Sequence, residues 1–185
     1  MTSPATRDPR AEGLRSVLAP LAVTLLGAAL LAALDGLPAL VAGEPRGLRR
    51  AANLEEAERA LHARLVLPAY FPASLRWPPH RIRYLVGQPS AVALAVDAQD
   101  GSPHLLLAET TGPGAVPTEL LPDAPVLSRS PVAVGPAQGM LSRVVDDGVV
   151  TLEVEWQLGG RSLLLRSRGS LDELLRMARS AREAP

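Results

Sequence analysis

The chain has 185 residues, and its 19 basic and 19 acidic side chains leave it without net charge. This balance argues against a nucleic-acid-binding protein, because such proteins attract their partner with a basic surface. The sequence contains no cysteine, which excludes disulfides, thiolate metal ligands and cysteine nucleophiles. Its length leaves room for one domain of ordinary size beside a short appendage.

A long apolar run lies near the N-terminus. Residues 16–34 contain no charged side chain, and three arginines precede them. Because about 20 apolar residues cross a bilayer as a helix, the run predicts a transmembrane helix or signal anchor at 16–34, between a short tail at 1–15 and a juxtamembrane linker at 35–52. A cleaved signal peptide is the alternative, but the run exceeds the usual apolar region of such a peptide and no A-x-A site follows it. A buried helix of a soluble protein is the third interpretation.

The folded domain is expected at residues 53–183 and opens with a short amphipathic helix. Asn53 is followed three positions later by Glu56, the pattern of a helix N-cap, and the helix is expected to end near residue 63. Residues 65–80 then hold four prolines and most of the aromatic side chains of the chain. This composition predicts an extended or turning segment.

A series of strands follows. The apolar patterns predict strands at residues 81–86, 91–97, 104–110, 132–134, 140–145, 151–158 and 161–168. A Pro/Gly-rich connection at 110–125 interrupts the series, and long connections of this kind are often functional or mobile. The fold class is therefore expected to be α+β, with a curved, meander-like antiparallel sheet of about six or seven strands. A short N-terminal helix and a C-terminal helix are expected to pack on it.

The last two strands and the helix after them form one unit. Apolar and polar residues alternate over 151–158, and the Gly159-Gly160 pair suits a two-residue hairpin turn. This turn places Glu153 opposite Arg166, as an exposed cross-strand ion pair. Ser170 and Glu173 then form a capping box at the start of an amphipathic helix. The expected structural core of the unit consists of Leu152, Val154, Trp156, Leu171, Leu174 and Leu175.

The two ends of the domain carry recognisable motifs. The domain opens with "NLEEAERALHARLVLPAYFP" and closes with "LEVEWQLGGRSLLLRSRGSLDELLRMARS". The first resembles the opening helix and proline-bearing segment of the bacterial DUF4367-type domain, and the second resembles its closing hairpin and helix. The resemblance implies a small α+β domain, often displayed outside the cytoplasmic membrane by one N-terminal helix and sometimes attached to anti-sigma factors. The domain is also, more remotely, similar to the lipoprotein-carrier and sigma-regulator sensor folds. The chain departs from the family in the 110–125 connection and in lacking a zinc-finger segment before the apolar run.

The resemblance implies a single-pass protein of the cytoplasmic membrane with an extracytoplasmic domain. Arginines flank the apolar run on both sides, so charge alone does not orient it. The family has no established catalytic residues that could be carried over. The expected partners are the membrane, through the N-terminal helix, and an envelope protein, peptide or lipidic ligand.

Residue patterns for catalysis or metal binding are not found. The histidines His62, His80 and His104 lie far apart in the sequence, whereas a metal site needs three or four converging ligands. Nucleophile-elbow and glycine-rich phosphate motifs are also missing. We therefore expect no catalytic residue, no metal and no cofactor.

Two hypotheses for function follow. The favoured one is a non-catalytic binding domain, for which Tyr70, Phe71 and Trp77 are the best candidates for partner or ligand contact. These aromatic side chains could instead cap the core beneath the sheet. The alternative function is an envelope enzyme of the metal-dependent hydrolase type, which requires His80, His104 and a carboxylate such as Asp97 or Glu109 to converge around a cleft.

Overall fold

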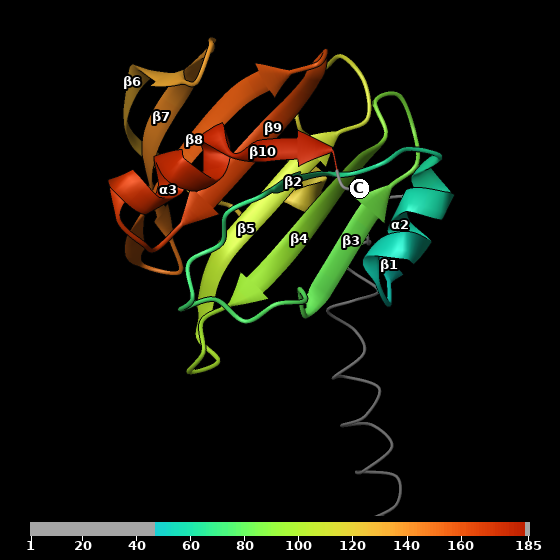
Figure 1. Cartoon of the computed structure of the whole chain (residues 1–185), viewed down its shortest axis with the longest axis horizontal. Coiled ribbons are helices and arrows are strands. Elements are labelled where there is room, and N and C mark those ends of the chain that lie inside the picture. Colours follow the sequence, from blue (N-terminus) through green and yellow to red (C-terminus); the bar gives the residue numbers. More distant parts are fainter. Residues whose placement is uncertain (1–46, 184–185) are drawn as a thin grey trace, which may run out of the picture. The chain divides into compact units, whose positions relative to one another are not determined.

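An eight-stranded antiparallel sheet organises residues 47–183, the part of the chain that the computed structural model describes (Figure 1). The predicted tail and transmembrane helix at 1–34 lie outside the described residues, as does most of the predicted linker. Within residues 47–183, no helix is both long enough and apolar enough to span a bilayer.

The strands of the large sheet have the order β1-β3-β4-β5-β9-β8-β7-β6, and β2 pairs with β10 in a separate two-stranded sheet. Their bounds are β1 (Leu48–Ala51), β2 (Val66–Pro68), β3 (Arg81–Leu85), β4 (Ala91–Asp97), β5 (Pro103–Thr110), β6 (Val126–Val134), β7 (Ala137–Asp146), β8 (Val149–Leu158), β9 (Arg161–Ser167) and β10 (Ala181–Glu183). The helices are α2 (Leu54–Leu61), α3 (Leu171–Arg179) and the short 3₁₀ turn η1 (Thr118–Leu120).

The α+β class is confirmed, but the sheet is not one continuous meander. Strands β3 to β5 form one antiparallel series and β6 to β9 form another, and the pairing of β5 with β9 joins them. Residues 111–125 carry the chain from β5 to the far edge of the sheet, where β6 begins. The folded unit also begins earlier than expected, because β1 lies within the predicted linker at 35–52 and pairs with β3.

Both predicted helix N-caps are confirmed. The side chain of Asn53 accepts a hydrogen bond from the Glu56 amide at 2.9 Å, and the Glu56 carboxylate accepts from the Ala52 amide at 2.8 Å. Ser170 accepts from the Glu173 amide at 3.3 Å. The bonds to the Glu56 and Glu173 amides satisfy backbone donors that the first turn of a helix leaves without partners.

One face of the large sheet bears the larger core. Helices α2 and α3 and the small sheet pack on this face, which receives alternate side chains of the central strands. Trp156 of β8 is only 4% exposed, and Val154 and Leu174 are completely buried. The closing hairpin β8–β9 therefore lies within the sheet, between β5 and β7, and α3 packs on this face of it.

The predicted core set needs one correction. Leu175 is buried and Leu152 is partly buried against the core, but Leu171 is 39% exposed. Leu171 is the first residue of α3, directly after the Ser170 cap. The apolar stripe of α3 that faces the sheet is formed by Leu174, Leu175, Met177 and Ala178.

The opposite face is covered by the connection between β5 and β6. Ala91, Ala93 and Ala108 form a floor of small side chains, on which Val116 and Leu120 pack. Leu120 is completely buried, and its carbonyl oxygen accepts a hydrogen bond from Arg83 Nη2 at 2.8 Å. The Pro/Gly-rich segment is thus a structural cover for the second face.

This cover changes the environment of the predicted Glu153–Arg166 pair. The register is confirmed, since the two residues lie opposite each other in β8 and β9. The expected exposure is wrong, because both residues are buried, at 8% and 5% exposure. Arg166 Nε and Nη2 contact Glu153 Oε2 at 2.9 and 2.8 Å, and Arg166 Nη1 donates to the carbonyl oxygen of Pro122 in the covering segment at 3.2 Å.

Candidate apolar groove beside the small sheet

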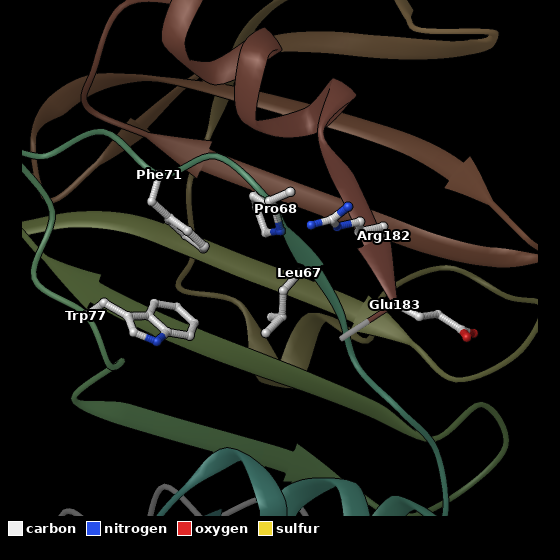
Figure 2. A pocket seen from close by; sticks show the side chains of 7 residues that line it. Leu67, Pro68, Phe71, Trp77, Arg182 and Glu183 are labelled. Atoms are coloured by element: carbon white, nitrogen blue, oxygen red, sulfur yellow. The ribbon is translucent and has the colours of Figure 1, made fainter. Parts of the chain in front are cut away.

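An open groove lies between the small sheet and the proline-bearing segment that follows β2 (Figure 2). Its volume is about 250 Å³ and its surface is mostly apolar. Phe71 and Trp77 stand on one side and point toward Leu67, whereas Arg182 and Glu183 lie at the other end. Pro68 and Ala69 complete the lining.

The two aromatic rings of the groove contact each other. The ring centroids of Phe71 and Trp77 are 4.8 Å apart, and the ring planes are inclined by 38°. The Trp77 side chain remains 44% exposed, whereas Phe71 is partly buried against the core. An exposed tryptophan supported by a second ring offers an apolar contact surface with few degrees of freedom.

The segment that carries these rings is fixed to the turn between β4 and β5. The Gln99 side chain donates from Nε2 to the carbonyl oxygens of Ala73 at 3.3 Å and Leu75 at 2.9 Å. The Gln99 amide also donates to the Ser74 carbonyl oxygen at 2.8 Å, and Leu75 is buried. The groove wall is therefore held in place before any ligand arrives, which lowers the entropic cost of binding.

Tyr70, the third predicted contact residue, does not line the groove. Its backbone amide donates to Ser180 Oγ at 3.1 Å. The guanidinium of Arg176 lies 3.9 Å above the centre of the Tyr70 ring, a cation–π contact. Tyr70 therefore joins the segment to α3, and the structure brings only Phe71 and Trp77 together at the groove.

The polar end of the groove carries an acidic residue, Glu183, that faces an arginine, and a basic residue, Arg182, that is in none of the ion pairs found within residues 47–183. Glu183 Oε1 lies 3.4 Å from Arg161 Nη2, and Arg161 Nη1 donates to the Arg64 carbonyl oxygen at 2.6 Å. Arg182 is exposed, and none of the ion pairs found within residues 47–183 includes it. Arg182 can therefore meet an anionic group of a ligand.

A buried carboxylate lies beneath the small sheet. Glu109 of β5 is completely buried, and the Val66 amide lies 3.0 and 3.1 Å from its two carboxylate oxygens. Burial raises the pKa of Glu109 to about 8, and the Val66 hydrogen bond and the charge of Arg161 only partly oppose this shift. The carboxyl group thus ties the strand that bears Leu67 to the large sheet.

The enzyme hypothesis requires two histidines and a carboxylate around a cleft, and the structure brings His80 and Asp97 together. His80 Nδ1 lies 3.2 Å from Asp97 Oδ2. Glu109 and His104 stand near opposite ends of β5, five residues apart, which corresponds to roughly 17 Å along a strand. Within residues 47–183, no group of three or more His, Cys, Asp or Glu side chains is arranged to hold a metal ion.

Comparison with known proteins gives no relative. No protein-family model, curated protein or solved structure matches the chain. The resemblance to DUF4367-type domains therefore depends only on the sequence motifs at the two ends of the domain.

Sequence reasoning identified one wall of the groove and missed the other. Phe71 and Trp77 were recognisable because aromatic residues are rare in this chain and gather at 65–80. Leu67 and Arg182 were missed because their proximity depends on the pairing of β2 with β10, in which they are direct partners. Glu109 was considered only as a possible metal ligand, because sequence alone does not show which face of a strand is buried.

Proposed function

We propose that residues 53–183 form a non-catalytic binding domain of a bacterial envelope protein. In this proposal residues 16–34 anchor the chain in the cytoplasmic membrane, and the domain lies on the extracytoplasmic side. The observation that carries the proposal is the preformed apolar groove with two aromatic rings in its wall and an exposed arginine at its end.

The lining favours a lipidic ligand with an anionic head group. Leu67, Phe71 and Trp77 offer an apolar surface for an alkyl chain, which gains free energy when its surface leaves water. Arg182 stands where the head group of such a ligand would lie, and it is exposed. Glu183, the acidic neighbour, faces Arg161 at 3.4 Å. An anionic amphiphile therefore fits the groove better than a cationic one.

The test is a titration of the purified chain with dodecanoate below its micelle concentration, followed by tryptophan fluorescence. Trp77 is one of two tryptophans in the chain and is 44% exposed, so an alkyl chain beside it should shift its emission to shorter wavelength. Trp77→Phe should abolish the shift. Dodecyltrimethylammonium, which has the same chain and the opposite charge, should bind at least several-fold more weakly because it meets Arg182.

Matched variants separate the groove from the general surface. Phe71→Ala and Arg182→Gln should each weaken binding of dodecanoate. Leu127→Ala should leave it unchanged, because Leu127 is 57% exposed on the far edge strand β6. Binding that is insensitive to Phe71→Ala, or equal for the two amphiphiles, would contradict the proposed ligand class.

A further inference from the structure

The first edge of the large sheet is strongly basic. Strands β1 and β3 have the sequences LRRA and RIRYL, with four arginines and no acidic residue. Arg50 lies directly opposite Arg83 in the pairing of the two strands. Arg81 is two residues before Arg83, so it projects to the same face.

The arginines of this edge are accessible. Arg49, Arg50 and Arg81 are exposed, and none of the ion pairs found within residues 47–183 includes them. Acidic residues also lie on the elements around this edge. Asp97 pairs with His80 at 3.2 Å, η1, which packs near β3, contributes Glu119, and α2, which packs on β1 and β3, contributes Glu55 and Glu56. We define the basic edge as Arg49, Arg50 and Arg81.

The chain length keeps the basic edge close to the expected anchor. Residues 35–46 connect the apolar run at 16–34 to the folded unit that begins with β1. At no more than about 3.6 Å per residue, this connection spans at most about 43 Å. A basic surface that is tethered next to a bilayer meets anionic head groups at high effective concentration.

We propose that the basic edge docks on the anionic lipid head groups of the membrane that holds the anchor. This inference rests on the anchoring part of the proposed function and adds a second contact with the same membrane. Docking fixes the β1 edge of the sheet against the bilayer and leaves the β6 edge, at the other end of the strand order, directed into the surroundings. The attraction is electrostatic, so it weakens when salt shortens the Debye length.

The chain contains no cysteine, so single cysteines can report on docking in the full chain. Val86→Cys places a thiol directly after β3, where the native residue is 51% exposed, and Leu127→Cys places one on β6, where the native residue is 57% exposed. Each variant is reconstituted into phosphatidylcholine vesicles with or without phosphatidylglycerol. The rate of labelling with a membrane-impermeant maleimide is then measured.

Docking predicts that phosphatidylglycerol slows labelling at Val86→Cys about threefold or more and leaves Leu127→Cys unchanged. High salt, or the combined change Arg49→Gln/Arg50→Gln/Arg81→Gln, should restore the faster rate. The matched change Arg129→Gln/Arg143→Gln should not restore it, because it removes two exposed arginines from β6 and β7.

Two results overturn the inference, and they are distinguishable. Equal labelling rates in the two kinds of vesicle, with the chain retained after alkaline washing, contradict docking and leave the anchor intact. Release of the chain from both kinds of vesicle by alkaline washing contradicts the anchor and therefore also removes the tether on which docking depends.

Discussion

The two faces of the large sheet are covered in different ways. The face toward α2 and α3 has large side chains, among them Trp156, packed under amphipathic helices. The opposite face has alanines beneath the Pro/Gly-rich segment, with the buried Arg166–Glu153 pair at its side. The first face is stabilised mainly by apolar burial. The second also depends on a short list of polar contacts, so the two faces should respond differently to substitution.

The proline-bearing segment at the groove and residues 111–125, which cover the second face of the sheet, differ in where they place their apolar side chains. The groove wall is fixed by side-chain hydrogen bonds from Gln99, but its surface is apolar and open. The covering segment buries its apolar residues Val116 and Leu120 against the sheet. Two segments with four prolines each therefore have opposite roles: residues 65–80 present aromatic rings to the surroundings, and residues 111–125 close the core.

The largest effect is expected from Trp156 on the helix-covered face. Trp156→Ala should lower the free energy of unfolding by about 3 to 5 kcal/mol, because it removes a large side chain from a packed core and leaves a cavity. Chemical denaturation of the two proteins measures the difference. A loss below about 1 kcal/mol would contradict the burial of Trp156.

The buried ion pair tests the opposite face. Arg166→Met should cost about 3 kcal/mol, because it leaves the Glu153 carboxylate buried without its partner. The double change Glu153→Leu/Arg166→Met should return stability to within about 1 kcal/mol of the native chain, since buried ion pairs often have apolar replacements of equal stability. If the double variant is as unstable as Arg166→Met, the Pro122 contact and not the unpaired charge determines the loss.

Glu109 links the stability of the helix-covered face to pH. Because burial raises the pKa of Glu109 to about 8, the folded chain retains a proton that the unfolded chain releases above its ordinary pKa of 4.5. The free energy of unfolding should therefore fall as pH rises between these values, by about 2 kcal/mol from pH 6 to pH 8. Denaturation of Glu109→Gln over this range should show a correspondingly flatter profile, and parallel profiles would contradict the assignment.

The sequence predicted best those parts of the fold that local rules determine. The helix caps at Asn53 and Ser170 and the Glu153–Arg166 register follow from spacing within a few residues. Strand β1 was missed because two of its four residues are arginines. Strand β6 was predicted only at 132–134, because the six other residues of this nine-residue edge strand are all exposed and give no apolar alternation.

Burial on the second face could not be read from periodicity. Arg166 and Glu153 have the composition of exposed strand positions, and only the path of residues 111–125 across the sheet buries them. The same reason applies to the groove. Arg182 and Glu183 of β10 line it together with Phe71 and Trp77, which lie more than a hundred positions earlier in the chain. Long-range pairing decides both features, and local patterns do not encode it.

The smallest effect on the free energy of unfolding is expected at Leu171, which the sequence predicts to be a core residue and the structure exposes. Leu171→Ala should change the free energy of unfolding by less than about 1 kcal/mol, because Leu171 is 39% exposed at the start of α3 and partial exposure leaves little apolar surface to lose. Leu174→Ala, three residues later and completely buried, is the matched control and should cost about 2 to 5 kcal/mol. Denaturation of both variants under one set of conditions gives the comparison. Equal losses would mean that the stripe of α3 facing the sheet includes Leu171, as the spacing of its leucines alone suggests.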